Sequence, residues 1–332
     1  MIGCPDHGPP SEPDHRFCEV CGRNLLTGEP APQSEPAPQS VSPTWLSSRA
    51  AEPACASCGT AYVGDEAYCD HCGRRRPVGR EHADLDLGAV AGVTDRGMRR
   101  RRNEDAIAVG RTGDVTAAVV CDGVSTSTHP DTAAYAAAEA GIAALLAAFA
   151  HTADPTRATL DGAQAAAAAA RATAGPDAGD SPPSCTYVSG IVTADTVTVG
   201  WIGDSRAYWL GADPACLTVD DSVAGQLAAG RPLPPGLDAD PESRALIRWL
   251  GADSDATEAQ VVSLRPAGPG RLLLCTDGLH DYLSDPRALA AAASGQLIDV
   301  ARRLTTIALD GGGHDNVTVA VLSHAASGGS VQ

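Results

Sequence analysis

The stretch TDRGMRRRRNEDAIAV, residues 94–109, places an arginine run directly before the acidic pair Glu104 and Asp105. A short connector leads to VTAAVVCDGV, residues 115–124, an apolar strand pattern that ends on Asp122 and Gly123. Cationic and anionic groups are thus crowded beside an apolar strand. This arrangement predicts a site for a polyvalent cation next to a site for an anion.

Two later carboxylates occupy the same kind of position. Asp277 follows the apolar run RLLLC, and Asp315 precedes the β-rich run NVTVAVL. If both runs are buried strands, each Asp lies at a strand end, where side chains from neighbouring strands can converge. Several carboxylates share a small volume only when protons or a metal neutralise them. Ligands that are all oxygen favour Mg²⁺ or Mn²⁺ over zinc.

Five short motifs occur in a fixed order along residues 88 to 323: RNED, CDGV, WIGDSRAYWL, TDGL and HDNVTV. Each one alone is weak, because Asp-Gly pairs are common in turns. The ordered set resembles the metal-dependent Ser/Thr protein phosphatases of the protein phosphatase 2C (PPM) family, in its bacterial branch. The resemblance implies an α+β fold, a four-layer α-β-β-α sandwich with the metal site at one edge.

The resemblance also implies roles for individual residues. Two Mn²⁺ or Mg²⁺ ions, about 3.5–4 Å apart, would bind the phosphate and activate the attacking water. Asp122 would bridge the ions, Gly123 would offer its carbonyl, and Asp277 and Asp315 would hold the first ion. Glu104 and Asp105 would act directly or through waters, and Arg100 would grip the substrate phosphate.

The chain departs from the family pattern at two places. The family usually has further glycines after Asp-Gly, whereas this chain has DGVSTS at residues 122–127. Where the family often places an Asp for a third metal, Ser181 aligns, and the adjacent Asp180 is the candidate substitute. Asp204 is predicted to have a structural role. His129, His280 and His314 are candidates for protonating the leaving group, since an unperturbed histidine titrates near neutrality.

The pattern of apolar residues predicts strands and helices in alternating blocks. Many strands with helices bundled in pairs favour an α+β sandwich over an alternating parallel sheet. The expected strands are residues 87–93, 107–109 and 115–121, a hairpin within 196–210, and runs at 261–264, 271–275 and 316–322; the expected helices are 131–150, 156–174, 286–293 and 296–310.

Seven of the eleven cysteines precede residue 73, in a repeat with an offset of 51 residues. Each half contains two knuckles separated by ten residues, a layout that resembles tandem zinc ribbons. Four soft ligands close a tetrahedral zinc site, and so small a module cannot fold without its metal. Rubredoxin-like iron uses the same spacing, although the histidine in the first half argues against iron there. The predicted zinc ligands are Cys4, His7, Cys18 and Cys21 in the first ribbon and Cys55, Cys58, Cys69 and Cys72 in the second.

Composition divides the chain further. The segment between the ribbons repeats EPAPQS and should be a disordered linker, with Trp45 as its one large apolar residue. The predicted domains are zinc ribbon 1 at 1–26, a Pro/Ser-rich linker at 27–53, zinc ribbon 2 at 54–76, a linker at 77–86, the phosphatase domain at 87–323 and a flexible tail at 324–332.

A net charge of −17 argues against binding nucleic acid or an anionic membrane. No run approaches the roughly 20 apolar residues of a membrane span, and no signal pattern begins the chain, so we expect a cytoplasmic protein. The expected partners are a phosphorylated protein substrate, in a pathway that opposes a bacterial Ser/Thr kinase, and a protein that binds the ribbons. The alternative hypothesis is a weak or inactive phosphatase fold that serves as a scaffold and binds a partner through its zinc ribbons.

Overall fold

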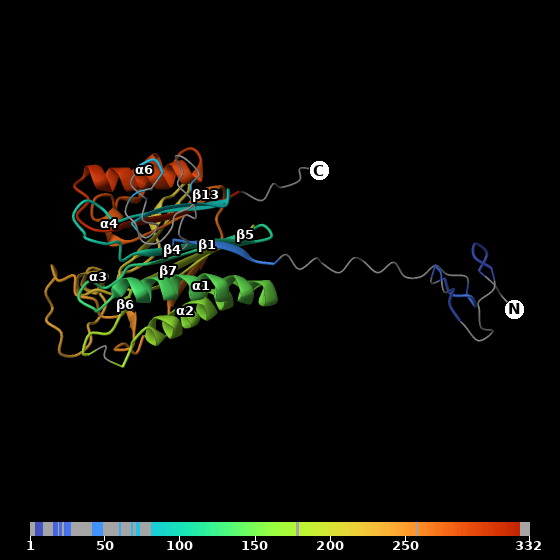
Figure 1. Cartoon of the computed structure of the whole chain (residues 1–332), viewed down its shortest axis with the longest axis horizontal. Coiled ribbons are helices and arrows are strands. Elements are labelled where there is room, and N and C mark those ends of the chain that lie inside the picture. Colours follow the sequence, from blue (N-terminus) through green and yellow to red (C-terminus); the bar gives the residue numbers. More distant parts are fainter. Residues whose placement is uncertain are drawn as a thin grey trace. The chain divides into compact units, whose positions relative to one another are not determined.

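The computed structural model divides the chain into two compact units, Met1–Val41 and Ser42–Gln332. It describes residues 4–8, 16–18, 20–21, 23–27, 42–48, 60, 68, 71–73, 81–176, 179–256 and 258–325. The second unit contains two six-stranded antiparallel sheets that pack face to face, with helices on both outer faces (Figure 1). These four layers agree with the α-β-β-α sandwich predicted from the sequence.

The first sheet continues directly from the Glu104–Asp105 pair. Its strands β4 and β5 form a hairpin, and β7 and β8 form a second one beside it. In spatial order the sheet contains β1 (Thr44–Ser47), β4 (Ala106–Thr112), β5 (Val115–Cys121), β7 (Tyr187–Val192), β8 (Val197–Ile202) and β12 (Gln260–Leu264).

The second sheet brings the segments around Asp277 and Asp315 together, because β13 and β14 are neighbours in it. In spatial order it contains β10 (Ala215–Cys216), β9 (Arg206–Leu210), β13 (Gly270–Cys275), β14 (Val317–His324), β3 (Val90–Asp95) and β2 (His82–Asp86). A separate two-stranded sheet pairs β11 (Leu250–Gly251) with β6 (Ser184–Cys185).

Helices α1 (Pro130–Thr152) and α2 (Pro155–Ala172), green in Figure 1, cover the first sheet. Their alanine and glycine side chains allow close packing, and Gly141 lies against Tyr187 of β7 and Ala166 of α2. Asp154 caps α2 by accepting hydrogen bonds from the N–H groups of Thr156 and Arg157. The second sheet carries α4 (Asp277–His280), α5 (Pro286–Ala292) and α6 (Leu297–Asp310), while α3 (Val223–Ala228) follows β10.

The apolar core has three layers. One cluster lies between the first sheet and α1 with α2, another lies between the second sheet and α5 with α6. The third fills the space between the sheets and includes Ile107 and Val109 of β4 as well as Leu272 and Leu274 of β13. Since both faces of each sheet are covered, the central strands are mostly apolar, and all six residues of β7 are buried.

Two predicted elements differ from the structure. Residues 87–93 do not form one strand, because Gly88, with φ +78°, turns the chain between β2 and β3. Residues 196–210 do not form a hairpin, because β8 belongs to the first sheet and β9 to the second. Gly203, with φ +107°, allows the chain to pass from one sheet to the other.

The predicted linker 27–53 contains a strand. Residues Thr44–Ser47 form β1, which pairs with β4 from Thr44 opposite Arg111 to Ser47 opposite Ala108. Ser47 Oγ donates to Glu139 of α1 at 2.9 Å, and the Ser48 N–H donates to the Ile107 carbonyl at 2.9 Å. The predicted linker 77–86 likewise contains β2. The sandwich therefore includes residues on both sides of the second cysteine-rich segment.

Replacing Leu46 by Pro should lower the stability of the sandwich. In the antiparallel ladder the Leu46 N–H faces the carbonyl of Val109, its register partner, and proline cannot donate. Leaving that edge unpaired should cost about 1–3 kcal/mol, or a few degrees in Tm. Thermal melts of the full chain check this, with Ser42→Pro as the control because Ser42 precedes the paired residues. Equal melting temperatures for the two variants would show that β1 contributes nothing.

Helix α1 corrects the expectation that no run in the sequence approaches the apolar length of a membrane span. Among the helices in the described part of the chain, it alone has the length and apolar composition of a membrane span, with a mean hydropathy of 1.6. Half of that window is buried inside the protein, where α1 packs on α2 and on β4 and β5. Its apolar character is explained by this packing in the core.

Candidate metal and phosphate site

Acidic side chains from distant parts of the sequence converge at one edge of the sandwich. Asp105 precedes β4, Asp122 follows β5, and Asp277 begins α4 directly after β13. Asp315 lies two residues before β14. A cavity of about 480 Å³, here called the carboxylate cavity, has among its lining residues Arg100, Asp122, Asp204, Arg244, Asp277 and Asp315.

Two glycines allow these segment ends to approach one another. A Cβ atom on Gly278 would overlap the Asn316 carbonyl, so only glycine lets α4 begin against the segment that carries Asp315. A Cβ atom on Gly97, whose φ is +77°, would overlap the Asp315 carbonyl. The Asn316 side chain adds hydrogen bonds to the N–H of Glu104 and to the carbonyl of Arg102. The loop before β4 is thereby fixed against Asp315.

Asp105 is the most deeply buried of the acidic residues. Its Oδ2 accepts hydrogen bonds from Thr276 Oγ1 at 2.9 Å and Thr318 Oγ1 at 2.7 Å. Its Oδ1 and the Oδ1 of Asp277 are both buried and have no hydrogen-bond donor within the described part of the chain. A buried carboxylate oxygen without a donor costs free energy, and a divalent cation would supply the missing partner.

Burial and mutual repulsion raise the pKa values of the cluster. Burial, with smaller effects of neighbouring carboxylates, raises the pKa of Asp105 to about 7 and that of Asp277 to about 6. The same causes raise the pKa of Asp122, where Asp105 is the strongest neighbour. Without a cation, the site therefore favours protonated carboxyl groups. Hard divalent ions fit this donor set of buried carboxylate oxygens.

Two arginines face the carboxylates across the cavity. Arg100 donates to Asp315 Oδ2 at 2.5 Å and to Ser125 Oγ at 2.9 Å. Arg244 donates to Asp277 at 3.0 Å and to Asp281 at 2.6 Å. These two guanidinium groups are the cationic side chains that line the carboxylate cavity, and both can reach a bound anion there.

The DGVSTS segment holds its conformation through neighbours other than further glycines. The Val124 N–H donates to the Ser184 carbonyl at 2.9 Å, and Ser127 Oγ accepts from the Ser184 N–H at 3.2 Å. A Cβ on Gly123 would lie 2.7 Å from the Glu104 carbonyl oxygen, so this position requires glycine. The Asp-Gly turn is therefore retained although the sequence after it departs from the family pattern.

Sequence reasoning did not assign Asp204 or Arg244 to the cavity. Asp204, predicted to be structural, lines the cavity, and burial followed by repulsion from Asp277 raises its pKa to about 7. Its position directly after Gly203, where the chain crosses between sheets, was the available signal. Arg244 had no signal, because it lies in an irregular segment and matches none of the five motifs.

The other predicted residues are distributed around the cavity. Asp180 is exposed and is not among the lining residues, although its neighbour Ser181 is. His280 is buried, and burial lowers its pKa to about 4, so it is neutral at pH 7. His314 lines an adjoining cavity with Tyr282, and its backbone N–H donates to the Tyr282 hydroxyl. Of the three histidines, His314 is thus placed near Asp315.

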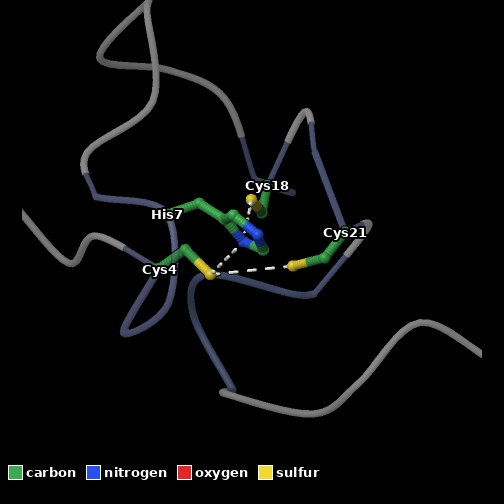
Figure 2. Close-up of side chains that lie close together, drawn as sticks. All are labelled: Cys4, His7, Cys18 and Cys21. Atoms are coloured by element: carbon green, nitrogen blue, oxygen red, sulfur yellow. Dashed lines mark hydrogen bonds between the residues drawn. The ribbon is translucent and has the colours of Figure 1, made fainter.

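The amino-terminal unit brings the four predicted ligands of the first ribbon together (Figure 2). The ligand atoms of Cys4, His7, Cys18 and Cys21 all lie within 4.8 Å of one another. Cys4 Sγ lies 3.5 Å from His7 Nδ1 and 3.6 Å from Cys21 Sγ. A backbone hydrogen bond from Asp6, aided by contacts with His7, lowers the pKa of Cys4 to about 6, which favours the thiolate.

The second predicted ribbon falls largely outside the described residues. Cys55, Cys58 and Cys69 lie there, whereas Cys72 is described and exposed. Its metal site stays a prediction.

Comparison with known proteins agrees with this geometry. Residues 97–306 match the family model described as protein phosphatase 2C. The serine/threonine protein phosphatase PstP of Mycobacterium tuberculosis (strain H37Rv) is 32% identical over 243 residues, which are 70% of this chain and 44% of PstP. The chain thus spans less than half the length of this curated relative.

Solved structures show the same fold. The catalytic domain of PstP, in complex with two manganese ions, is 27% identical with a TM-score of 0.50 and covers 71% of this chain and 97% of its own. The phosphatase MsPP from Mycobacterium smegmatis is 27% identical with a TM-score of 0.51, covering 72% and 98%. Stp1 from Staphylococcus aureus, at 22% identity and a TM-score of 0.56, covers 73% and 98% and shares the fold.

The layered sandwich with carboxylates at one edge defines the class of the chain, an α+β fold shared with serine/threonine phosphatases. More narrowly, the chain belongs to the protein phosphatase 2C family. Members of this family use two Mn²⁺ or Mg²⁺ ions.

Proposed function

We propose that this chain hydrolyses phosphoserine and phosphothreonine in proteins with the help of two Mn²⁺ or Mg²⁺ ions. The observation that carries the proposal is the pair of buried oxygens beside the carboxylate cavity, Asp105 Oδ1 and Asp277 Oδ1, for which the described residues provide no donor. A scaffold has no need for unpaired buried carboxylates, whereas a divalent cation site requires them.

The residues that would hold the ions are Asp105, Asp122, Asp277 and Asp315, together with the Gly123 carbonyl. When bound, two such ions polarise a phosphate ester and lower the pKa of the attacking water. Thr276 and Thr318 donate to Asp105 Oδ2 and thereby orient this carboxylate. Its other oxygen, Oδ1, is left to bind an ion. Glu104 lies next to Asp105 in the loop before β4, and burial raises the pKa of its carboxyl group.

Arg100 would bind the substrate phosphate. Its guanidinium group is about one third exposed and is held by Asp315 and Ser125 at the cavity wall. A phosphate offers the same kind of charge-assisted acceptor as the Asp315 carboxylate, and Arg can grip it with two parallel hydrogen bonds. Arg100 would then exchange part of its contact with Asp315 for the substrate.

The experiment is hydrolysis of p-nitrophenyl phosphate and of a phosphothreonine peptide with Mn²⁺ and with excess chelator. We expect turnover with Mn²⁺ and background rates with chelator. No turnover together with no binding of Mn²⁺ in a calorimetric titration would instead support the alternative scaffold function, whose motive is the altered DGVSTS segment. The physiological role would be to oppose a Ser/Thr kinase in the cytoplasm.

The cysteine-rich segments are proposed to be two structural zinc ribbons that bind a protein partner. The support is the convergence of Cys4, His7, Cys18 and Cys21, a closed four-ligand set of the kind that favours zinc. The 51-residue repeat extends the proposal to Cys55, Cys58, Cys69 and Cys72.

Replacing Cys18 by Ser should remove one zinc per chain, because a closed site with three ligands loses most of its affinity. Elemental analysis of the full chain should give two zinc atoms for the wild type and one for the variant. Cys216→Ser, at an exposed cysteine outside both repeats, is the control and should retain two. Equal zinc content in all three proteins would contradict the assignment.

A further inference from the structure

A second cavity, of about 470 Å³, lies beside the carboxylate cavity, and we call it the arginine cavity. Four consecutive arginines contribute to its wall, opposite the start of helix α1. Its lining residues are Arg99, Arg100, Arg101, Arg102, Glu104, Ser127, Thr128, His129 and Pro130. Arg100 and Ser127 line both cavities, so the two are contiguous.

Two of the four arginines in this cavity have no ion-pair partner in the described part of the chain. Arg100 is paired with Asp315, and Arg102 lies 3.7 Å from Asp131. Arg99 and Arg101 are exposed, and neither has a carboxylate within 4.0 Å in the described part of the chain. Among the described residues that line the cavity, Glu104 is the one carboxylate. Since the whole chain carries −17, this concentration of cations is local.

The backbone of helix α1 adds to the positive electrostatic field in the arginine cavity. Helix α1 has 23 residues and begins at Pro130, and the preceding His129 makes no capping hydrogen bond with its side chain. The positive end of the helix dipole therefore points toward the cavity wall. The helix dipole adds to the charge of the four arginines, and without them it would not be sufficient to bind an anion.

We infer that the arginine cavity binds a second anionic group of the substrate, on a residue near the phosphorylated one. This inference rests on the proposed phosphatase function. The phosphorylated side chain would enter the carboxylate cavity, and an acidic residue or a second phosphate on the same peptide would face Arg99 and Arg101. The substrate class is accordingly an acidic or multiply phosphorylated segment of protein, not an isolated phosphoresidue in a neutral or basic context.

The chemistry of the cavity favours this ligand over nucleic acid. Guanidinium groups pair with carboxylates and phosphates through parallel hydrogen bonds. A nucleic acid would need a cationic surface along many phosphates, which the acidic balance of the chain opposes. A confined cationic cavity joined to a phosphate site suits one or two anionic groups on a short extended segment.

Binding of fluorescent phosphothreonine peptides to the full chain tests the inference. Three peptides have neutral residues, glutamates or a phosphotyrosine beside a non-hydrolysable phosphonate analogue of phosphothreonine, and binding is measured by anisotropy with Mn²⁺, because the ions are proposed to hold the phosphate. We expect the two anionic peptides to bind roughly 3- to 10-fold more tightly than the neutral one at low salt. The difference should shrink as salt rises, because exposed charges are screened. The glutamate and phosphotyrosine arms show which anion is preferred.

The double variant Arg99→Gln/Arg101→Gln should bind all three peptides with similar affinity. Arg111→Gln is the matched control, because Arg111 is an exposed arginine near the opposite end of β4, and it should retain the preference. Equal affinities for the three peptides in the wild type would overturn the inference, and so would an unchanged preference in the double variant. Tighter binding of a single-stranded oligonucleotide than of any peptide would overturn it in favour of nucleic acid.

The same sequences with hydrolysable phosphothreonine, incubated with Mn²⁺, separate this inference from the proposed function. Hydrolysis of p-nitrophenyl phosphate, together with hydrolysis of all three peptides at equal kcat/KM, would leave the phosphatase function in place. It would overturn the inference that the arginine cavity binds a second anionic group. A preference in binding with no hydrolysis of any substrate would overturn the phosphatase function and would still support an anion site at Arg99 and Arg101.

Discussion

Replacing Asp122 by Asn is expected to reduce Mn²⁺-dependent kcat/KM for a phosphothreonine peptide by at least about 10²-fold. Asp122 follows β5 at the point where the carboxylates beside the ends of β4, β13 and β14 converge, and it is proposed to contact both ions. Asparagine keeps the shape of the side chain and removes the charge that balances them. Initial rates at saturating Mn²⁺ measure the effect.

The control is Asp114→Asn, an exposed aspartate at the other end of the β4–β5 hairpin, which should keep full activity. In chelator the Asp122 variant should melt no lower than the wild type, because burial and neighbouring carboxylates disfavour the charged form of Asp122. An inactive variant with a lowered Tm would indicate misfolding. An active one would remove Asp122 from the site.

The second large effect concerns metal-free protein. Burial raises the folded-state pKa of Asp105 and Asp204 to about 7 and that of Asp277 to about 6. The unfolded chain releases these protons near pH 4, so between about pH 4 and 7 the folded state binds more protons than the unfolded state. Stability in chelator should therefore fall as the pH rises through this window, by up to about 1.4 kcal/mol per pH unit for each such group.

Thermal melts between pH 4.5 and 7, with chelator and with Mn²⁺, check this dependence. Mn²⁺ should raise Tm more at pH 7 than at pH 4.5, because protons compete with the ions for the carboxylates. Asp105→Asn should flatten the curve in chelator. His82, whose hydrogen bonds with Asp84 and Asp95 raise its pKa to about 9, contributes stability that is lost only above its unfolded pKa near 6.5. A Tm in chelator that rises from pH 5 to 7 would contradict the proposed cluster.

Much of the sandwich could be predicted from the sequence, because the local signals for helices and strands agree with the pattern of buried residues. Helices α2 and α6 follow apolar periodicity, α1 is apolar along nearly its whole length, and α1, α2 and α5 begin at a proline. The carboxylates of the cavity were found because Asp122 and Asp277 each stand between an apolar strand and a glycine. Gly278 shows the physical reason, since a side chain there would exclude the Asn316 carbonyl.

The parts of the fold and site that could not be predicted depend on contacts between distant segments, which no local sequence pattern encodes. Strand β1 is four residues in a Pro/Ser-rich segment, and it is ordered by the free edge of β4 and by Glu139 of α1. β8 and β9 looked like a hairpin because their sequences are adjacent, although they pair with different sheets. Arg244 reaches Asp277 only after an irregular segment has folded back over the cavity.

Anomalous diffraction from crystals of the full chain soaked in Mn²⁺ tests the central claim most directly. The account predicts two manganese peaks in the carboxylate cavity, with oxygens of Asp105, Asp122, Asp277 and Asp315 as ligands. Crystals that bind no manganese there at saturating Mn²⁺ would contradict it.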